Sequence, residues 1–120
     1  MEKCILVVDD DTMNLKRTKI ILQRHYDVLF AESGEEALNM LKSEKIDMVL
    51  LDIEMPNMNG IETFERMRDD AIDIPVIFLT ASGDEDDVLD ALSLGAVNYL
   101  KKPFFPQELL KRVAMGLEEQ

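Results

Sequence analysis

The chain has 120 residues, 47% of them hydrophobic, which is enough for one domain with a buried core. Its 25 acidic and 13 basic residues give a net charge of −12, and nucleic acid binding relies on lysine and arginine, so we expect none by this chain alone. No stretch approaches the roughly 18 apolar residues of a membrane span, and no export signal is recognisable. We therefore expect a single domain over residues 1–120, cytoplasmic and without membrane attachment.

Five apolar segments alternate with five segments of helical periodicity. The predicted strands are residues 3–9, 26–31, 46–52, 75–80 and 96–100. The predicted helices are residues 12–24, 34–43, 60–70, 84–94 and 106–118. Capping-box spacing marks three helix starts, at Ser33 with Glu36, Asn59 with Glu62 and Ser82 with Glu85. Asp11 is the expected N-cap of the first helix.

The first, third and fourth strands are apolar at nearly every position, a pattern typical of strands that are covered on both faces. The alternation of strands and helices predicts an α/β fold, a doubly wound five-stranded parallel sheet of the flavodoxin-like type with helices on both faces. Winding in both directions from the first strand gives the order 2-1-3-4-5. That order places the ends of strands one and three side by side at the switch point.

Polar side chains stand where four of these strands end. Asp9 and Asp10 follow the first strand, Asp52 ends the third, Thr80 ends the fourth, and Lys102 follows the fifth. In an open α/β sheet, ligands bind outside the carboxyl ends of the strands at the switch point. We therefore expect these side chains to form one site.

The chemistry of such a site follows from its charges. Two carboxylates about 4–5 Å apart repel by about 1 kcal/mol in water and by about 4 kcal/mol at an effective dielectric near 20, so a proton or a cation must separate them. The cluster offers only oxygen ligands, which favours Mg²⁺ over zinc, and Mn²⁺ could substitute. A carboxylate there can attack phosphorus and form an aspartyl phosphate, while Thr80 and a lysine hold other phosphoryl oxygens.

Four segments carry a family resemblance: Ile5–Asp10, Leu50–Gly60, Leu79–Ala81 and Lys102–Phe104. In this order and at these intervals, they resemble the receiver domain of two-component response regulators, of the chemotaxis-receiver-like type. The resemblance implies a response regulator receiver that accepts a phosphoryl group from a histidine kinase phosphohistidine. It also implies a switch of the surface formed by the fourth helix, fifth strand and fifth helix, which would control a partner or an attached output domain.

The resemblance also implies roles for single residues. Asp52 would be the phosphoacceptor and a metal ligand, Asp10 a direct ligand, and Asp9 a ligand through water. The backbone carbonyl of Glu54 would complete the protein's share of the Mg²⁺ site. The side chain of Glu54 and that of Ser82 occupy positions that tune phosphate lifetime in the family.

Beyond the metal site, Thr80 and Lys102 would sense the phosphoryl group, and Tyr99 matches the aromatic switch position. The Lys102–Pro103 bond would be cis, as is usual in the family. The implied partners are a sensor histidine kinase or a histidine phosphotransfer protein, with homodimer formation on phosphorylation as a further expectation. The domain would modify and dephosphorylate itself and would not be a turnover enzyme.

Phe105 stands at the expected N-cap of the last helix, where a polar residue normally accepts a backbone hydrogen bond worth about 0.5–2 kcal/mol. Two interpretations remain open. The side chain could offset this loss by packing against the ends of the chain's own helices. Alternatively, it could lie beside Tyr99 on a partner or dimer surface, where aromatic residues often anchor contacts.

Three other functions compete with this interpretation. A phosphatase of the haloacid dehalogenase type would use Asp9 as nucleophile, but it needs a hydroxyl residue where Met13 stands and an acidic pair on a strand end after Lys102. A flavodoxin-type cofactor module would not place three aspartates where a phosphate must bind. A receiver-like binding module that works without phosphorylation is disfavoured, because every site position has a competent residue.

Overall fold

The computed structural model describes residues 3–81 and 85–118 of the chain. In this part the elements, in chain order, are β1 (Cys4–Val8), α1 (Thr12–Leu22), β2 (Asp27–Ala31), α2 (Gly34–Ser43), β3 (Met48–Asp52), α3 (Gly60–Asp69), β4 (Val76–Thr80), α4 (Glu85–Ser93), β5 (Asn98–Lys101) and α5 (Pro106–Glu118). Each predicted strand and helix is therefore present, and α2 and α5 have the predicted bounds. None of the helices in the described ranges is long and apolar enough to cross a membrane.

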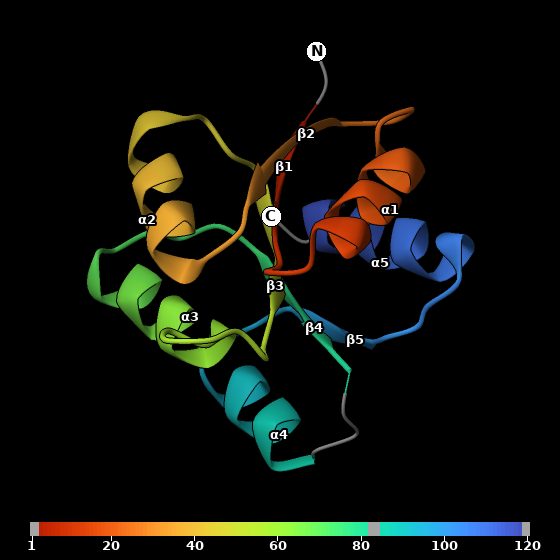
Figure 1. Cartoon of the computed structure of the whole chain (residues 1–120). Helices are drawn as coiled ribbons and strands as arrows, with labels where there is room; N and C mark the ends of the chain where they lie inside the picture. The colour runs from red at the N-terminus through yellow and green to blue at the C-terminus, as the bar shows by residue number, and fades with distance from the viewer. Residues whose placement is uncertain (1–2, 82–84, 119–120) are drawn as a thin grey trace.

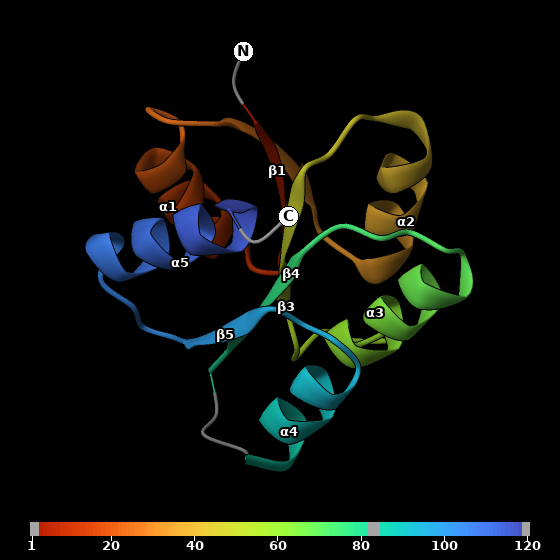
Figure 2. The ribbon, with the colours of Figure 1, turned by 180° about the vertical axis from the view of Figure 1, so that it is seen from behind.

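The strands form one parallel sheet in the order β2-β1-β3-β4-β5. The predicted order is confirmed, as is the flavodoxin-like α/β class. Helices α1 and α5 cover one face of the sheet, and α2, α3 and α4 cover the other (Figures 1 and 2). Because both faces are covered, a polar site must lie at an end of the strands, and in open α/β sheets ligands bind at the carboxyl ends.

The pleat of the strands divides the core into two apolar layers within the described residues. Leu6 and Val8 of β1 belong to the layer beneath α2, α3 and α4, whereas Ile5 and Val7 belong to the layer beneath α1 and α5. Alternate side chains of a strand point to opposite faces, so both sets must be apolar. This explains why the central strands lack the alternation of a half-exposed strand.

The helix starts were predicted well where they are described. The Asp11 side chain accepts a hydrogen bond from the Met13 amide at 2.9 Å, as an N-cap should. Asn59 and Glu62 form the complete reciprocal capping box at the start of α3. The Ser33 hydroxyl accepts a hydrogen bond from the Glu36 amide at 3.1 Å. The expected box at Ser82 lies outside the described residues.

Backbone contacts fix the connection from β3 to α3, which follows the last residue of β3, Asp52. The Ile53 amide donates to the Leu79 carbonyl, and the Gly60 amide donates to the Ile53 carbonyl, both at 2.9 Å. A Cβ at position 60 would collide with the Asp52 carbonyl oxygen, so only glycine allows α3 to begin this close to the strand end. Both ends of the connection between Asp52 and Gly60 therefore lie close to the carboxyl end of β3.

Candidate functional site

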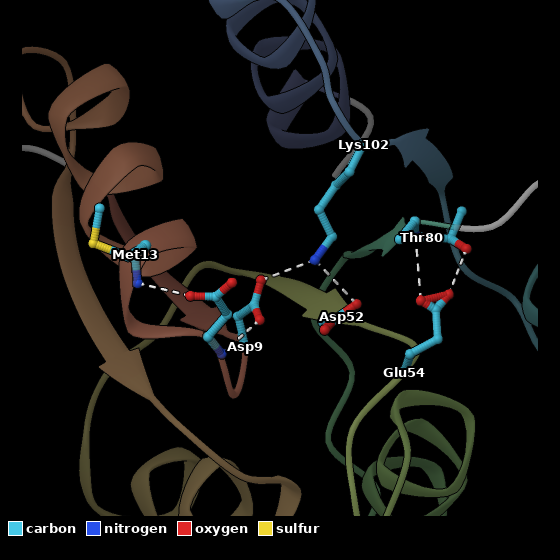
Figure 3. Close-up of polar contacts among 8 residues, drawn as sticks. Asp9, Met13, Asp52, Glu54, Thr80 and Lys102 are labelled. Atoms are coloured by element: carbon cyan, nitrogen blue, oxygen red, sulfur yellow. Dashed lines mark hydrogen bonds and ion pairs between the residues drawn. The ribbon is translucent and has the colours of Figure 1, made fainter.

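Side chains from four strand ends converge at the carboxyl edge of the sheet (Figure 3). Asp9 follows β1, Asp52 ends β3, Thr80 ends β4, and Lys102 follows β5. Asp9, Asp52 and Thr80 are buried, although each is polar or charged. Buried charges require partners, so the contacts among these residues determine what the site can do.

Lys102 supplies the positive charge between the two buried aspartates. Its Nζ lies 3.0 Å from Asp9 Oδ2, to which it donates a hydrogen bond, and 3.3 Å from Asp52 Oδ1. The side chain is only 16% exposed. Burial by itself would lower the pKa of the Lys102 ammonium, but the charges of Asp52 and Asp9 outweigh it and hold that pKa above its usual value. Lys102 therefore stays charged.

Asp52 is the least satisfied group of the site. Burial raises its pKa from the usual 3.8 to about 7; Lys102 opposes the rise, and the charges of Asp9 and Glu54 add to it. Among the described residues, Asp52 Oδ1 is the buried side-chain atom that has no hydrogen-bond partner. Its ion pair with Lys102 therefore lacks hydrogen-bond geometry. A buried anionic oxygen in this state favours an additional cation or a proton.

Asp9, Asp10 and Asp52 form a cluster suited to a divalent metal. Each offers one carboxylate oxygen, and these oxygens lie within 4.8 Å of one another. Asp10 is exposed at the rim of the cluster, whereas Asp9 and Asp52 are buried. The all-oxygen donor set, together with an Asp52 Oδ1 that has no hydrogen bond, fits a hard divalent cation.

Asp9 is more fully engaged than its two neighbours. Its Oδ2 accepts from Lys102 Nζ, and its Oδ1 accepts from the Asp11 amide at 3.0 Å. Direct coordination by Asp9 would therefore have to compete with two existing hydrogen bonds. Asp10 and Asp52 are the better placed direct ligands, and Asp9 suits contact through water.

One contact of the site was missed by sequence reasoning. The Thr80 hydroxyl donates to Glu54 Oε1 at 2.8 Å, and the Ala81 amide donates to Glu54 Oε2 at 3.3 Å (Figure 3). The resemblance implies that the Glu54 backbone carbonyl binds Mg²⁺ and that its side chain tunes phosphate lifetime. It does not imply a bond between Glu54 and Thr80. Asp52 pairs with Leu79 across β3 and β4, so a side chain shortly after β3 can reach the carboxyl end of β4. The sequence does not give this register, so it carried no signal for the contact.

Three predicted residues lie apart from the acidic cluster or outside the description. Tyr99 on β5 is 38% exposed, and its carbonyl accepts from Arg112 Nη1 of α5 at 3.0 Å. Phe105 is 76% exposed, so the interpretation that it packs against the chain's own helices is wrong. Ser82 falls outside the described residues. The Lys102–Pro103 bond is cis, as the resemblance implied.

Comparison with known proteins identifies the family. Residues 5–114 match the family model described as the response regulator receiver domain. The chain belongs to this family. The receiver domain is thus part of two-component signalling, and its family consists of phosphotransfer switches and not of turnover enzymes. Membership implies a histidine kinase as partner and contradicts the dehalogenase-type and flavodoxin-type alternatives.

Two curated relatives show how far the sequence similarity extends. The receiver domain is 41% identical to the alkaline phosphatase synthesis transcriptional regulatory protein PhoP of Bacillus subtilis, over 94% of this chain and 48% of that protein. It is 43% identical to the response regulator SaeR of Staphylococcus epidermidis, over 90% of this chain and 47% of that protein. The chain thus spans about half the length of the curated relatives it matches.

Solved structures agree closely in fold. A CheY-like receiver domain protein from Methanospirillum hungatei superposes with a TM-score of 0.93 at 33% identity, covering 99% of this chain and 96% of that one. The response regulator DrrB of Thermotoga maritima, an OmpR/PhoB homologue, gives a TM-score of 0.87 at 36% identity, covering 99% of this chain and 54% of that one.

The raised pKa of Asp52 predicts a pH-dependent stability in metal-free buffer. Between about pH 4 and pH 7 the folded domain holds a proton that the unfolded chain has released, so the free energy of unfolding should fall as pH rises through this window. Asp52→Asn should remove on the order of 2–4 kcal/mol of that fall, because each unit of pKa shift corresponds to about 1.4 kcal/mol. Urea unfolding in EDTA at pH 5 and pH 8 measures the difference.

The exposed Asp69→Asn variant is the matched control and should keep the pH dependence of the wild type. If Asp52→Asn loses as much stability between the two pH values as the wild type does, burial does not raise the pKa of Asp52.

Proposed function

We propose that this receiver domain accepts a phosphoryl group on Asp52 from the phosphohistidine of a histidine kinase or of a histidine phosphotransfer protein. The observation that carries the proposal is the buried Asp52 carboxylate, which has one oxygen without a hydrogen bond and lies beside Lys102. In the transfer, an Asp52 oxygen attacks phosphorus and the phosphorus–nitrogen bond breaks. The imidazole leaves with the electron pair and takes up a proton.

The charges around Asp52 support this reaction. Phosphoryl transfer depends mainly on positioning and on neutralising negative charge, and Lys102 can shift its ion pair from the Asp52 carboxylate to a phosphoryl oxygen. The Thr80 hydroxyl, at the end of the neighbouring strand, would donate to a second phosphoryl oxygen. Mg²⁺, or Mn²⁺ in its place, would supply further neutralising charge. Asp10, Asp52 and the Glu54 carbonyl would hold it, with Asp9 through water.

Access for the phosphodonor is favoured on the side of α1 and α5. A cavity of about 460 Å³ there is lined by Asp9 and Lys102, by polar and apolar residues of α1, Arg17 among them, and by the segment before α5. Water would later attack the acyl phosphate, which restores the Asp52 carboxylate and releases inorganic phosphate. Glu54 and Ser82 would tune the lifetime of the acyl phosphate. Because receiver domains are generally cytoplasmic, we place this exchange in the cytoplasm.

The output surface of the proposed switch is formed by α4, β5 and α5. Thr80 would move toward the phosphoryl group, Tyr99 would follow it, and the packing between β5 and α5 at Arg112 would change. Exposed apolar side chains on this surface include Leu89 and Leu92 of α4, and Phe105 stands before α5. They suit contact with a partner, a second copy of the chain or an attached output domain.

Residues 1–120 would act as a single receiver domain in this scheme. The relatives are longer regulators, and one of them is named a transcriptional regulatory protein, so a gene-regulatory output is part of the proposal. With a net charge of −12, this domain would leave any contact with nucleic acid to another domain.

A small phosphodonor tests the phosphoacceptor directly. Acetyl phosphate with Mg²⁺ should add one phosphoryl group to the wild type, and Asp52→Asn should stay unmodified, because its amide is not a nucleophile. Intact-mass spectrometry measures the addition, and lability in mild base identifies an acyl phosphate. Asp69→Asn, which changes an exposed acid on α3, should be labelled like the wild type.

Equal labelling of the wild type and Asp52→Asn would contradict the assignment. A wild type that binds Mg²⁺ but accepts no phosphoryl group from acetyl phosphate or from a phosphohistidine kinase would instead favour a receiver-like binding module that works without phosphorylation.

The metal site predicts a stabilisation by Mg²⁺ before any phosphorylation. A ligand that binds only the folded state adds about 2.7 kcal/mol at one hundred times its dissociation constant. The melting temperature of the wild type should therefore climb with Mg²⁺, and that of Asp10→Asn should climb much less. Thermal unfolding followed by circular dichroism measures both.

Asp11→Asn is the matched control, because Asp11 is adjacent and exposed, and asparagine can keep the N-cap bond to Met13. It should respond to Mg²⁺ like the wild type. An unchanged response in Asp10→Asn would remove Asp10 from the ligand set.

A further inference from the structure

The Glu54 carboxylate holds two hydrogen-bond donors at the end of β4. Its Oε1 accepts from the Thr80 hydroxyl at 2.8 Å, and its Oε2 accepts from the Ala81 amide at 3.3 Å. Glu54 is an exposed residue on the connection that follows β3, yet both of its carboxylate oxygens are bound (Figure 3). A side chain reaching out from this connection thus spans to the adjacent strand end.

These two donors already act as an oxyanion site. A hydroxyl and a backbone amide that donate to one carboxylate can also donate to phosphoryl oxygens, because both acceptors are oxyanions and charge-assisted hydrogen bonds form to either. The site adjoins Asp52, since Asp52 pairs with Leu79 and the Ile53 amide bonds the Leu79 carbonyl. The Glu54 carboxylate therefore occupies the position in which an oxygen of a phosphoryl group on Asp52 would accept hydrogen bonds from Thr80 and Ala81.

We infer that Glu54 is an internal competitor of the phosphoryl group, whose carboxylate occupies the Thr80 hydroxyl and the Ala81 amide until phosphorylation displaces it. The inference rests on the proposed function of Asp52 and adds a regulator to that site. A phosphoryl group on Asp52 would repel the Glu54 carboxylate as well as compete for its donors. Displacement turns Glu54 toward solvent and breaks the hydrogen bond between Glu54 and the Thr80 hydroxyl.

This device has two consequences for the switch. The unphosphorylated state is favoured, because the Thr80 hydroxyl is bound to Glu54 and can move toward a phosphoryl group on Asp52 only by losing that bond. The connection between β3 and α3 also changes with phosphorylation, because one of its side chains loses both partners. Glu54 is thus a positioning residue that acts through Thr80 and Ala81, distinct from its backbone carbonyl, which would serve the metal.

The test measures binding of beryllofluoride, a phosphoryl analogue, at saturating Mg²⁺ by ¹⁹F NMR or calorimetry. Glu54→Ala removes the competitor and should tighten binding about tenfold, which corresponds to 1.4 kcal/mol. Glu54→Gln keeps the size of the side chain and loses the charge, so it should give a smaller gain. Glu65→Ala, which removes an exposed glutamate of α3, should bind like the wild type.

A double-mutant cycle with Thr80→Val separates competition from simple charge repulsion. If Glu54 competes for the Thr80 hydroxyl, the gain from Glu54→Ala should fall to about threefold or less in the Thr80→Val background. A repulsive charge alone would give the same gain in both backgrounds and would overturn the inference, as would a Glu54→Ala variant that binds no more tightly than the wild type.

The outcomes also distinguish this inference from the proposed function. A wild type that binds beryllofluoride and is phosphorylated on Asp52, with unchanged affinity in Glu54→Ala, overturns the inference alone. A wild type that binds no beryllofluoride and accepts no phosphoryl group overturns both.

Discussion

The buried ion pairs of Lys102 with Asp9 and Asp52 are the constraint on which the site depends. Removing charges from water costs several kcal/mol per ion unless good partners replace the water. One ammonium serves two carboxylates here, so negative charge remains in excess and one Asp52 oxygen lacks a hydrogen bond. Burial, with the added charges of Asp9 and Glu54, raises the pKa of Asp52, and the excess of negative charge makes the site receptive to a divalent cation.

The fold explains why these charges meet. Covering both faces of the parallel sheet leaves its carboxyl edge as the place where side chains from separate strands converge. The close approach of Gly60 to the strand end returns the connection after Asp52 to the same edge, and so brings the Glu54 carboxylate within reach of Thr80. The scaffold therefore sets both the acidic cluster and the contact that holds the hydroxyl of Thr80.

The strands, their order and the convergence of Asp9, Asp52 and Lys102 could be predicted, because each depends on local apolar runs and on the residue that follows a strand. The side-chain contacts could not. The bond between Glu54 and Thr80 depends on the path of a connection that includes Asn57 at a φ of 69° and on the rotamer of an exposed glutamate. The exposure of Phe105 depends on how the segment before α5 leaves the sheet, about which helix capping says nothing.

The most direct test of the central claim is a crystal structure of the domain with Mg²⁺ and beryllofluoride. We expect Mg²⁺ to be bound by oxygens of Asp10, Asp52 and the Glu54 backbone, and the analogue to be bonded to Asp52. Lys102 and Thr80 should then donate to fluorine atoms of the analogue. A metal outside the acidic cluster, or an analogue bonded to another residue, would contradict the claim that the buried Asp52 carboxylate is the centre of this site.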